Sequence, residues 1–467
     1  MSTKTIFNLM WIALATLIVG CSNEERHNDI VINNVTVIDA ASTPRQERSV
    51  VIRDDKIFAV NPALKADAAL ADNVIDASGQ YLIPGLWDMH VHFLYEPKLT
   101  EQMADLFLQY GVTSVRDTGG NLEELVALRE RLKQRAKPVP HIYFSGPLLD
   151  GQFPVYDGSD PARPALGVDV ATRNAAQTRV KALKDAGADL IKIYELVQPD
   201  VYQALVDAAR SENLPIASHV PLMLTADQAG PLADSMEHLR NIELACASNW
   251  QELLKQRRTT IAAFTEGLGY NLRSGLHSAQ RLPAIAAYDE SRCNAVLDTL
   301  QNTTQVPTLR LNTVFQQQPW HRGDWPQALA GLPETVIQQW QSQIDFLSNS
   351  TATPDHRFAD WSLFLISRLL ARQVPIAAGT DTPIGLGIPG YSLHTELELL
   401  VAGGMTNQQA LHAATIAPTK FFSNAEVMGR IESGMAADLV LLNANPLQDI
   451  RNTREIDAVM VAGAWVD

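Results

Sequence analysis

Short apolar runs alternate with helical patterns through the middle of this chain, and that alternation constrains its fold more than any other feature. Runs of strand type lie near residues 86–92, 112–117, 141–146, 189–194, 215–220, 234–239, 306–312 and 374–381. Helical patterns follow several of them, at 123–136, 171–186, 199–212 and 407–417. A helix between two strands returns the chain to the same end of the sheet, so the strands pair in parallel. Eight such strands predict an α/β fold of the (β/α)₈ TIM barrel type.

Both ends of the chain have a different pattern, that of short β-strands. Apolar and polar residues alternate over 30–39 and 49–53, and strand patterns return over 438–442 and 458–461. At 467 residues the chain is too long for one ordinary core, so a barrel with a smaller second domain is expected. We predict a β-sandwich built from residues 29–83 and 425–467, beside a barrel over 84–424.

Six residues of metal-ligand type stand at the ends of these apolar runs. His90 and His92 come first, and side chains two apart on a strand share a face, so two imidazoles could bind one metal ion. The others are Lys192, His219, His238 and Asp381. Barrel enzymes carry their catalytic residues at the C-terminal ends of the strands, so we expect these six side chains to meet. The alternative for the first pair is a chance His-x-His on a surface strand.

The order His-x-His, Lys, His, His, Asp closely resembles the amidohydrolase superfamily. The local sequences PGLWDMHVHF, GVTSVRDTGG, SMEHL, AGTDTP and GRIESGMAADLVLLNANP are similar to its branch of imidazolonepropionase-like enzymes and metal-dependent Xaa-Pro dipeptidases. The resemblance covers nearly all of the chain after residue 29. It implies that His90, His92 and Asp381 hold one divalent ion, and that His219 and His238 hold a second. The chain departs from the branch at Leu239, where glycine is common.

The chemistry of these ligand types leads to a hydrolase. Lys192 can bridge two ions only as a carbamate, because an ammonium has no lone pair, and burial would free its amine to react with CO₂. Two ions, which these ligands suggest are Zn²⁺, could share a hydroxide by lowering the pKa of water from 15.7 toward about 7. By its position in the family, Asp381 would pass the proton of that water to the leaving nitrogen. The alternatives are an N-cap role for Asp381 and an acid-paired Lys192 beside a mononuclear site.

Two further residues are candidates for substrate binding. Tyr194 lies two residues after Lys192 and so faces the same side, where its hydroxyl could bind a substrate carbonyl or carboxylate. A tyrosine that faces the core is the alternative. Arg116 could neutralise a substrate carboxylate, or it could pair internally with Asp117 or another acid. His277 has no partner at ligand spacing and is predicted to be a surface or packing residue.

We expect a metal-dependent hydrolase of amide-type C–N bonds that acts on a dipeptide or an N-acyl amino acid. The alternatives are hydrolysis of a cyclic amide such as an imidazolone and, from another class, a non-catalytic binding lipoprotein. The formal net charge is −15 and no cluster of lysine or arginine interrupts it, which argues against a nucleic-acid partner. The partner expected in solution is therefore a small-molecule substrate.

The N-terminus predicts export and a lipid anchor. Residues 1–20 have a short apolar run after Lys4, as in a signal peptide, and Ile18-Val19-Gly20-Cys21 resembles a bacterial lipobox. Lipid on Cys21 and a tether over 21–28 would attach the protein to a membrane outside the cytoplasm. Ser22 favours the periplasmic face of the outer membrane. An ordinary signal peptide is the alternative.

Two cysteines remain once Cys21 is set aside. Cys246 and Cys293 would lie in an oxidising compartment and could pair, but a sequence does not give their separation, so the disulfide stays open. The oligomeric state is likewise open, and a homo-oligomer is compatible with the sequence.

Overall fold

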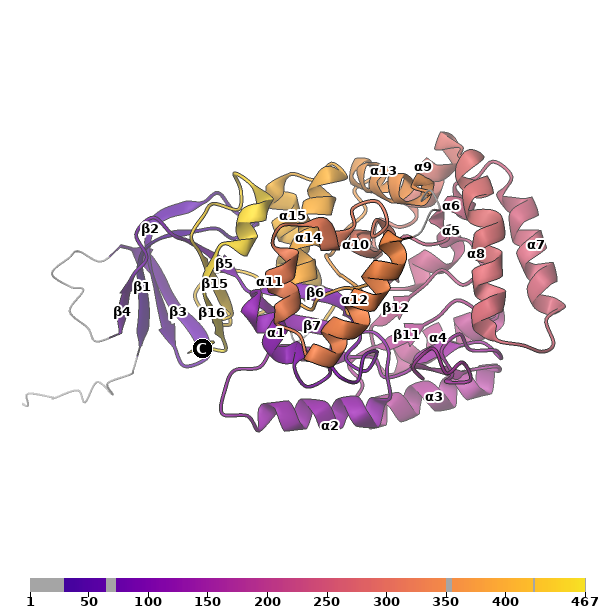
Figure 1. Ribbon diagram of the computed structural model, residues 1–467, viewed down its shortest axis with the longest axis horizontal. Helices are drawn as coiled ribbons and strands as arrows, with labels where there is room; N and C mark the ends of the chain where they lie inside the picture. The colour runs from indigo at the N-terminus through magenta and orange to yellow at the C-terminus, as the bar shows by residue number, and fades with distance from the viewer. Residues whose placement is uncertain (1–28, 64–72, 350–354, 423–424, 467) are drawn as a thin grey trace, which may run out of the picture.

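The computed structural model describes residues 29–63, 73–349, 355–422 and 425–466. The molecule is elongated, with a β-sheet at one end and helices α7 (Trp250–Ala262) and α8 (Gly269–Ala286) at the other (Figure 1). The predicted signal peptide, the tether and Cys21 fall outside the described residues. Within the described part of the chain, none of the helices has both the length and the apolar character that crossing a membrane requires.

Strands from both chain ends join in one eight-stranded sheet. They are β1 (Ile30–Val37), β2 (Arg45–Arg53), β3 (Lys56–Pro62), β4 (Val74–Asp76), β5 (Tyr81–Pro84), β15 (Leu439–Leu442), β16 (Ile456–Val461) and β17 (Ala464–Trp465). Their order is β17-β16-β15-β5-β1-β2-β3, and β4 pairs with β1. Because β15 runs antiparallel to β5, the two ends of the chain meet at this pair.

The two ends thus share a sheet, but the predicted two-layer sandwich is not confirmed. The sheet has its own apolar core, which includes the fully buried Ile32, Val50, Leu82, Leu439 and Met460. Alternating residues determine which face of a strand is apolar, but they do not determine what that face packs against. One sheet therefore satisfies the same sequence pattern.

Parallel strands form two further sheets between these ends. One contains β6 (Leu86–Val91), β7 (Val112–Asp117) and β8 (His141–Phe144) in that order. The other has the order β10-β9-β11-β12-β13-β14, with β9 (Leu148–Asp150), β10 (Gly167–Asp169), β11 (Ile191–Ile193), β12 (Ile216–Ser218), β13 (Ser235–Glu237) and β14 (Thr304–Val306). The α/β class is confirmed, and β9 and β10 are strands that the sequence pattern did not predict.

The eighth predicted strand, at 374–381, is not a regular strand, and continuous pairing does not close the barrel. The segment makes single parallel bridges, Gln305 to Ile376 and Val91 to Thr382. Pro375 has no N–H to donate, and Asp381 has a φ of 62°, which interrupts an extended backbone. The Asp381 N–H still donates to His90 O at 2.7 Å, which holds Asp381 beside β6.

The seventh strand, predicted at 306–312, overlaps the observed strand β14 at Val306 alone. β14 stops at Val306, and Leu309–Asn312 forms the short helix α10. Pro307 cannot donate to a ladder, and Thr308 has a left-handed φ of 47°, so extended pairing stops there. The turn brings the Thr308 hydroxyl to the ring of His238, 2.7 Å from Nδ1.

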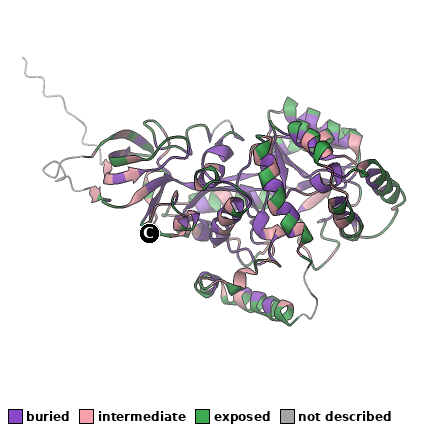
Figure 2. Cartoon of the chain, turned by 90° about the horizontal axis from the view of Figure 1, so that it is seen from above, coloured by how far each residue is buried: buried purple, intermediate pink, exposed green. Residues whose placement is uncertain are grey.

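Helices connect the strands close to where the sequence predicts them. The matching helices are α2 (Leu122–Lys133), α3 (Arg173–Asp185) and α4 (Pro199–Ser211), while the pattern at 407–417 is divided into α15 (Asn407–Ala413) and α16 (Ile416–Thr419). The side chains of Asn121 and Thr172 cap α2 and α3 by accepting hydrogen bonds from backbone N–H groups of the first turn. Surface helices carry buried residues on one side and exposed residues on the other (Figure 2).

Further helices follow β13 and β14 and cover the strand ends. The remaining helices are α1 (Met103–Gln109), α5 (Ala226–Ala229), α6 (Ile242–Ala245), α9 (Glu290–Asp298), α11 (Trp325–Ala330), α12 (Glu334–Ser348), α13 (Arg357–Ala371) and α14 (Tyr391–Ala402). A disulfide joins Cys246, at the end of α6, to Cys293 in α9. The pairing that the sequence left open is therefore present, and it ties together two helices that follow β13.

Candidate metal centre

The six predicted ligand residues come together at one cavity. His90 lies in β6 and His92 follows that strand, Lys192 lies in β11, His219 and His238 directly follow β12 and β13, and Asp381 lies beside β6. All six line a cavity of about 620 Å³, and none is more than 5% exposed. Five chain segments thus deliver these side chains to one place, because parallel strands end on the same side of a sheet.

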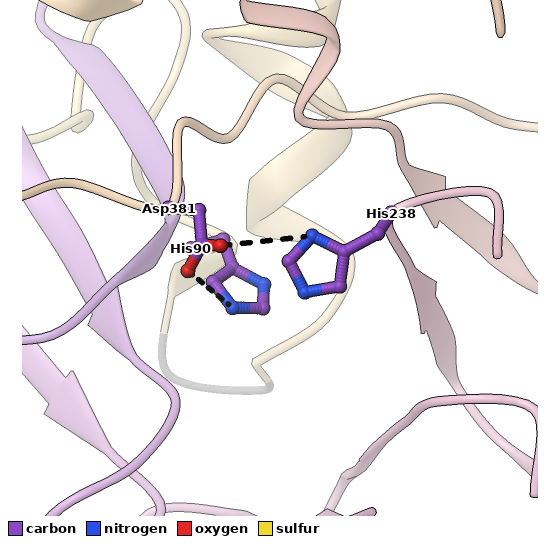
Figure 3. A group of neighbouring side chains, drawn as sticks. All are labelled: His90, His238 and Asp381. Carbon is purple, nitrogen blue, oxygen red and sulfur yellow. Dashed lines mark ion pairs between the residues drawn. The ribbon is translucent and has the colours of Figure 1, made fainter. Parts of the chain in front are cut away.

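Asp381 lies among three of the imidazoles. Its Oδ1 is 3.1 Å from Nε2 of His92 and 3.4 Å from Nε2 of His90, and its Oδ2 is 3.9 Å from Nδ1 of His238. Figure 3 shows the two carboxylate oxygens directed toward the rings of His90 and His238. Ligand atoms of His90, His238 and Asp381 all lie within 4.8 Å of one another, so these three residues could hold one metal ion.

Each of the four imidazoles has its Nδ1 beside a protein oxygen. These contacts are His90 to Glu237 (2.6 Å), His92 to Gly119 O (3.3 Å), His219 to Glu195 (2.7 Å) and His238 to Thr308 Oγ1 (2.7 Å). A histidine that donates from Nδ1 keeps a lone pair on Nε2, and this arrangement is typical of histidines that bind metal ions. The structure therefore leaves four Nε2 atoms available as ligands.

The charge state of three of these rings fits a cation at the site. Burial lowers the pKa of His90 to about 4, and burial also holds the pKa values of His219 and His238 well below the usual value. His90 is therefore neutral at pH 7, and its Nε2 lone pair lies 3.4 Å from a carboxylate oxygen of Asp381. Two electron-rich atoms in this position repel unless a cation lies between them. Imidazole and carboxylate ligands suit a divalent ion such as Zn²⁺.

Lys192 has an amine that is buried and lacks a hydrogen-bond partner among the described residues. Its nearest ion-pair partner, Glu237 Oε1, is 4.0 Å away. Burial lowers the pKa of Lys192 to about 7, so a substantial fraction of the amine is unprotonated at neutral pH. An unprotonated amine is the form that carbamate formation requires.

Comparisons with known proteins show similarity to a known family and fold. Residues 363–466, which include Asp381, match the model of the Amidohydrolase family. A crystal structure of a Xaa-Pro dipeptidase with bound methionine in its active site superposes with a TM-score of 0.67 and 20% identity, over 94% of this chain and 100% of that chain. These findings support the amidohydrolase superfamily. At this identity, the structural likeness itself shows the amidohydrolase fold.

Ochratoxinase of Aspergillus niger is similar in both sequence and structure. It is 41% identical over 120 residues, which are 25% of this chain and 25% of the relative. Its crystal structure has a TM-score of 0.63 and 20% identity, over 94% of this chain and 95% of that chain. An adenine deaminase of Desulforamulus reducens is 28% identical over 145 residues, 23% of its length. In sequence, the chain thus spans about a quarter of the length of these curated relatives.

Arg116 lies beneath the candidate metal site and not among the residues that line its cavity. The side chain is fully buried, with NH2 donating to Glu237 Oε1 at 2.9 Å, NH1 to Ser235 Oγ at 2.9 Å and Nε to Met89 O at 2.6 Å. This is the internal ion pair that the sequence left open, with Glu237 as the acid. Arg116 and Glu237 lie on neighbouring parts of the strands with their side chains directed inward. Because both charges are buried there, each needs the other as a partner.

A carboxylate that sequence analysis missed orients His219. Glu195 accepts a hydrogen bond from His219 Nδ1 at 2.7 Å through Oε1, and the same oxygen accepts from Arg273 at 3.0 Å. Its Oε2 lies 2.5 Å from Nε2 of His277. The prediction that His277 is a surface or packing residue is therefore wrong. Both partners lie on α8, far from Glu195 in sequence, so only their adjacency in the fold reveals the network.

Removal of the Glu195 carboxylate is expected to weaken metal binding. We expect Glu195→Ala to lower Zn²⁺ affinity by about 10–100-fold, because His219 loses the acceptor that orients its ring. Glu195→Gln, which keeps an acceptor for His219, should have a smaller effect. Competition with a chelator of known affinity measures both. Glu252→Gln on the exposed face of α7 is the matched control, and wild-type affinity in Glu195→Ala would contradict this role.

Tyrosine and arginine side chains form much of the remaining cavity wall. They are Tyr95, Tyr156, Tyr194, Tyr270, Arg163, Arg240, Arg273 and Arg281. Tyr194 thus faces the cavity as the sequence suggested, with its ring centroid 4.4 Å from that of His219. Burial raises the pKa of Tyr194 well above its usual value, so its hydroxyl stays protonated and can donate a hydrogen bond. The sequence could have placed Arg240 at the cavity, because it follows the predicted ligand His238 by two residues. No sequence pattern placed the residues of α8 there.

Proposed function

We propose that this chain is a metal-dependent hydrolase of amide-type C–N bonds that acts on a dipeptide or an N-acyl amino acid. One observation carries the proposal: six buried ligand-type side chains from five chain segments line one cavity, and a protein oxygen lies beside Nδ1 of each imidazole. The match to the amidohydrolase family model and the structural likeness to a Xaa-Pro dipeptidase and an ochratoxinase support it.

The residues divide between two ions in our proposal. His90, His92 and Asp381 would hold one, His219 and His238 the other, and carboxylated Lys192 would supply an oxygen to both. The unpaired amine of Lys192 and the lone pair of His90 facing Asp381 fit this assignment. When bound, divalent ions of this kind polarise a carbonyl and lower the pKa of water.

Asp381 is suited to move a proton at this site. Burial by itself would raise the pKa of Asp381, but the hydrogen bond from His92 and the nearby His90 and Arg240 together outweigh it and hold the pKa below its usual value. The carboxylate is therefore ionised at neutral pH, and an oxygen of Asp381 can accept a proton and return it to the leaving nitrogen. The tyrosine hydroxyls and arginines of the wall would orient a carbonyl and a carboxylate of the substrate, which favours an open amide over a neutral planar ring.

Metal content and turnover test the proposal together. For the chain from Ser22 onward, supplied with Zn²⁺, we expect about two ions per chain by mass spectrometry, because the ligand set can serve two. A screen of dipeptides and N-acyl amino acids should find a substrate, and a chelator should abolish its turnover until Zn²⁺ returns. Lys192→Ala should lower turnover by at least about 100-fold, as expected for loss of a ligand.

The matched control is Lys184→Ala, which removes an exposed lysine of α3 and should leave both readouts unchanged. A metal content near zero per chain after supplementation with Zn²⁺ or Mn²⁺ would contradict the proposal and favour the alternative of a non-catalytic binding protein. We also propose, from the N-terminal sequence, that a lipid on Cys21 attaches the protein to the cell envelope.

A further inference from the structure

Three arginines on one side of the cavity lie near the carboxylates of Glu195 and Glu243. Arg273 donates to Glu195 at 3.0 Å, while Arg240 approaches the same oxygen only to 4.0 Å. Arg281 lies 3.7 Å from the buried Glu243. Glu195 also serves His219 and His277, so its charge is divided among several donors. This wall therefore keeps an excess of positive charge.

Two donor atoms of this wall make no hydrogen bond within the described chain, and one of them, Nε of Arg281, is the atom that lies 3.7 Å from Glu243. Nε of Arg273 and Nε of Arg281 are buried and have no hydrogen-bond partner among the described residues. The side chain of Arg240 is 17% exposed and lies at the cavity, two residues after His238. Guanidinium groups bind carboxylates through paired, directional hydrogen bonds. The wall is thus suited to one carboxylate of a ligand.

Another part of the cavity is apolar. Its lining residues there are Leu311, Val314, Phe315 and Ile384, from the segment after β14 and the segment after Asp381. The ring of Phe358 in α13 instead lies under Arg281, whose guanidinium carbon is 4.0 Å from the ring centroid. Phe315 is 54% exposed although it is a large apolar side chain. Apolar lining beside a few convergent polar groups is typical of a pocket that binds an amphipathic small molecule. This part would contact an apolar group of the substrate.

The cavity offers no free acid for a substrate ammonium. Among the described residues that line it, the carboxylates are Asp355 and Asp381. Asp381 belongs to the ligand cluster, and Asp355 is held by its own neighbour Arg357, at 3.0 and 2.6 Å. A free dipeptide carries an α-ammonium next to the scissile amide, and burial of an unpaired charge is unfavourable. An acylated amino acid has no such charge.

We infer that this cavity selects amino acids N-acylated with an apolar acyl group, in preference to free dipeptides. The carboxylate would bind at Arg240, Arg273 and Arg281, and the acyl group would lie against Leu311, Val314 and Phe315. The inference rests on the proposed amide hydrolysis and narrows its substrate class.

Three compounds that differ by one group each test the inference. They are N-(4-methylpentanoyl)-L-alanine, its C-terminal amide, and L-leucyl-L-alanine, which adds only the α-amine. For the Zn²⁺-loaded chain, we expect kcat/KM for the acyl amino acid to exceed that for either of the others at least tenfold. Among straight-chain acyl groups, each added methylene should raise kcat/KM by roughly two- to fourfold while it contacts the apolar wall.

Two substitutions assign the preference to the wall. Arg240→Gln should lower kcat/KM for the acyl amino acid by roughly 10- to 100-fold, as for loss of a charged hydrogen bond, and should leave the amide nearly unaffected. Arg258→Gln, an exposed arginine of α7 outside the cavity lining, is the matched control. Phe315→Ala should flatten the dependence on acyl length. Calorimetric binding of the same three compounds to Asp381→Asn gives a readout that is independent of turnover.

The outcomes separate this inference from the proposed function. Turnover of L-leucyl-L-alanine equal to or above that of the acyl compound would overturn the inference and leave amide hydrolysis standing. If no compound is hydrolysed but binding still favours the acyl amino acid and depends on Arg240, the subsite stands and the proposed hydrolysis fails. Equal binding of all three compounds would overturn the subsite.

Discussion

Asp381→Asn is expected to lower kcat/KM by roughly 10²–10⁴-fold, the range for loss of a general acid–base group. Asparagine has no charge, and its amide cannot take the proton that a carboxylate accepts. It also replaces one of the oxygens that face His90, His92 and His238 at 3.1–3.9 Å. The measurement is steady-state hydrolysis of the best substrate from the screen, with metal content determined on the same samples.

Asparagine is the informative replacement because of the backbone at this position. Asp381 has a φ of 62°, a conformation that asparagine tolerates better than most residues. Asp355→Asn is the control, since it removes a carboxylate that lines the same cavity but is paired with Arg357. Unchanged turnover in Asp381→Asn would remove Asp381 from the mechanism. Equal losses of turnover in both variants would indicate that the negative charge in the cavity matters, and not a proton transfer by Asp381.

Glu237→Gln is expected to lower the free energy of unfolding by about 3–5 kcal/mol, as for other buried ion pairs that lose one partner. Arg116 and Glu237 are both fully buried and lie 2.9 Å apart, so the substitution leaves a guanidinium charge without its acid. Glu237 also holds Nδ1 of His90 at 2.6 Å. Urea unfolding in the presence of a chelator measures the change without a contribution from metal binding.

The pH dependence of this stabilisation has a definite sign. Burial would raise the pKa of Glu237, but Arg116, Lys192 and His90 together hold it well below the usual value. A depressed pKa in the folded state means that the stabilisation is present at neutral pH and is lost as the pH falls through the folded value. The difference between wild type and Glu237→Gln should therefore shrink in acid.

An exposed ion pair provides the control for this effect. Glu101 lies 2.7 Å from Arg131, and both side chains are more than half exposed. Glu101→Gln should change stability by no more than about 1 kcal/mol, because water screens the pair. If Glu237→Gln were equally mild, the buried pair would contribute little to the folded state.

Much of the site could be read from sequence because its residues obey local rules. His90 and His92 share a face through the two-residue period of a strand, and Lys192, His219 and His238 each stand at the end of an apolar run. The C-terminal ends of parallel strands lie on the same side of a sheet. Residues that end an apolar run in the sequence are therefore close together in the fold. The same rule worked less well for 374–381, where Pro375 and the left-handed Asp381 replace regular pairing by single bridges.

Side chains that act through distant partners were not predictable in this way. Arg116 carries the same charge whether it faces a substrate or a buried acid, and only the fold places Glu237 beside it. Glu195 and His277 are far apart in sequence and meet because α8 packs over the strand ends. The Cys246–Cys293 disulfide also requires the two cysteines to lie close together in space, and a sequence does not give that distance.

The sequence by itself determined the α/β class, the meeting of the two β-rich ends and the identity of the six ligand-type residues, since strand period and chain order are local properties. The tertiary structure alone decided how the strands of both chain ends pair in one eight-stranded sheet, and which oxygen orients each imidazole. It also decided that Arg240, Arg273 and Arg281 line the cavity while Arg116 does not. Contacts of this kind join residues from separate segments, and their geometry is set only when the whole chain packs.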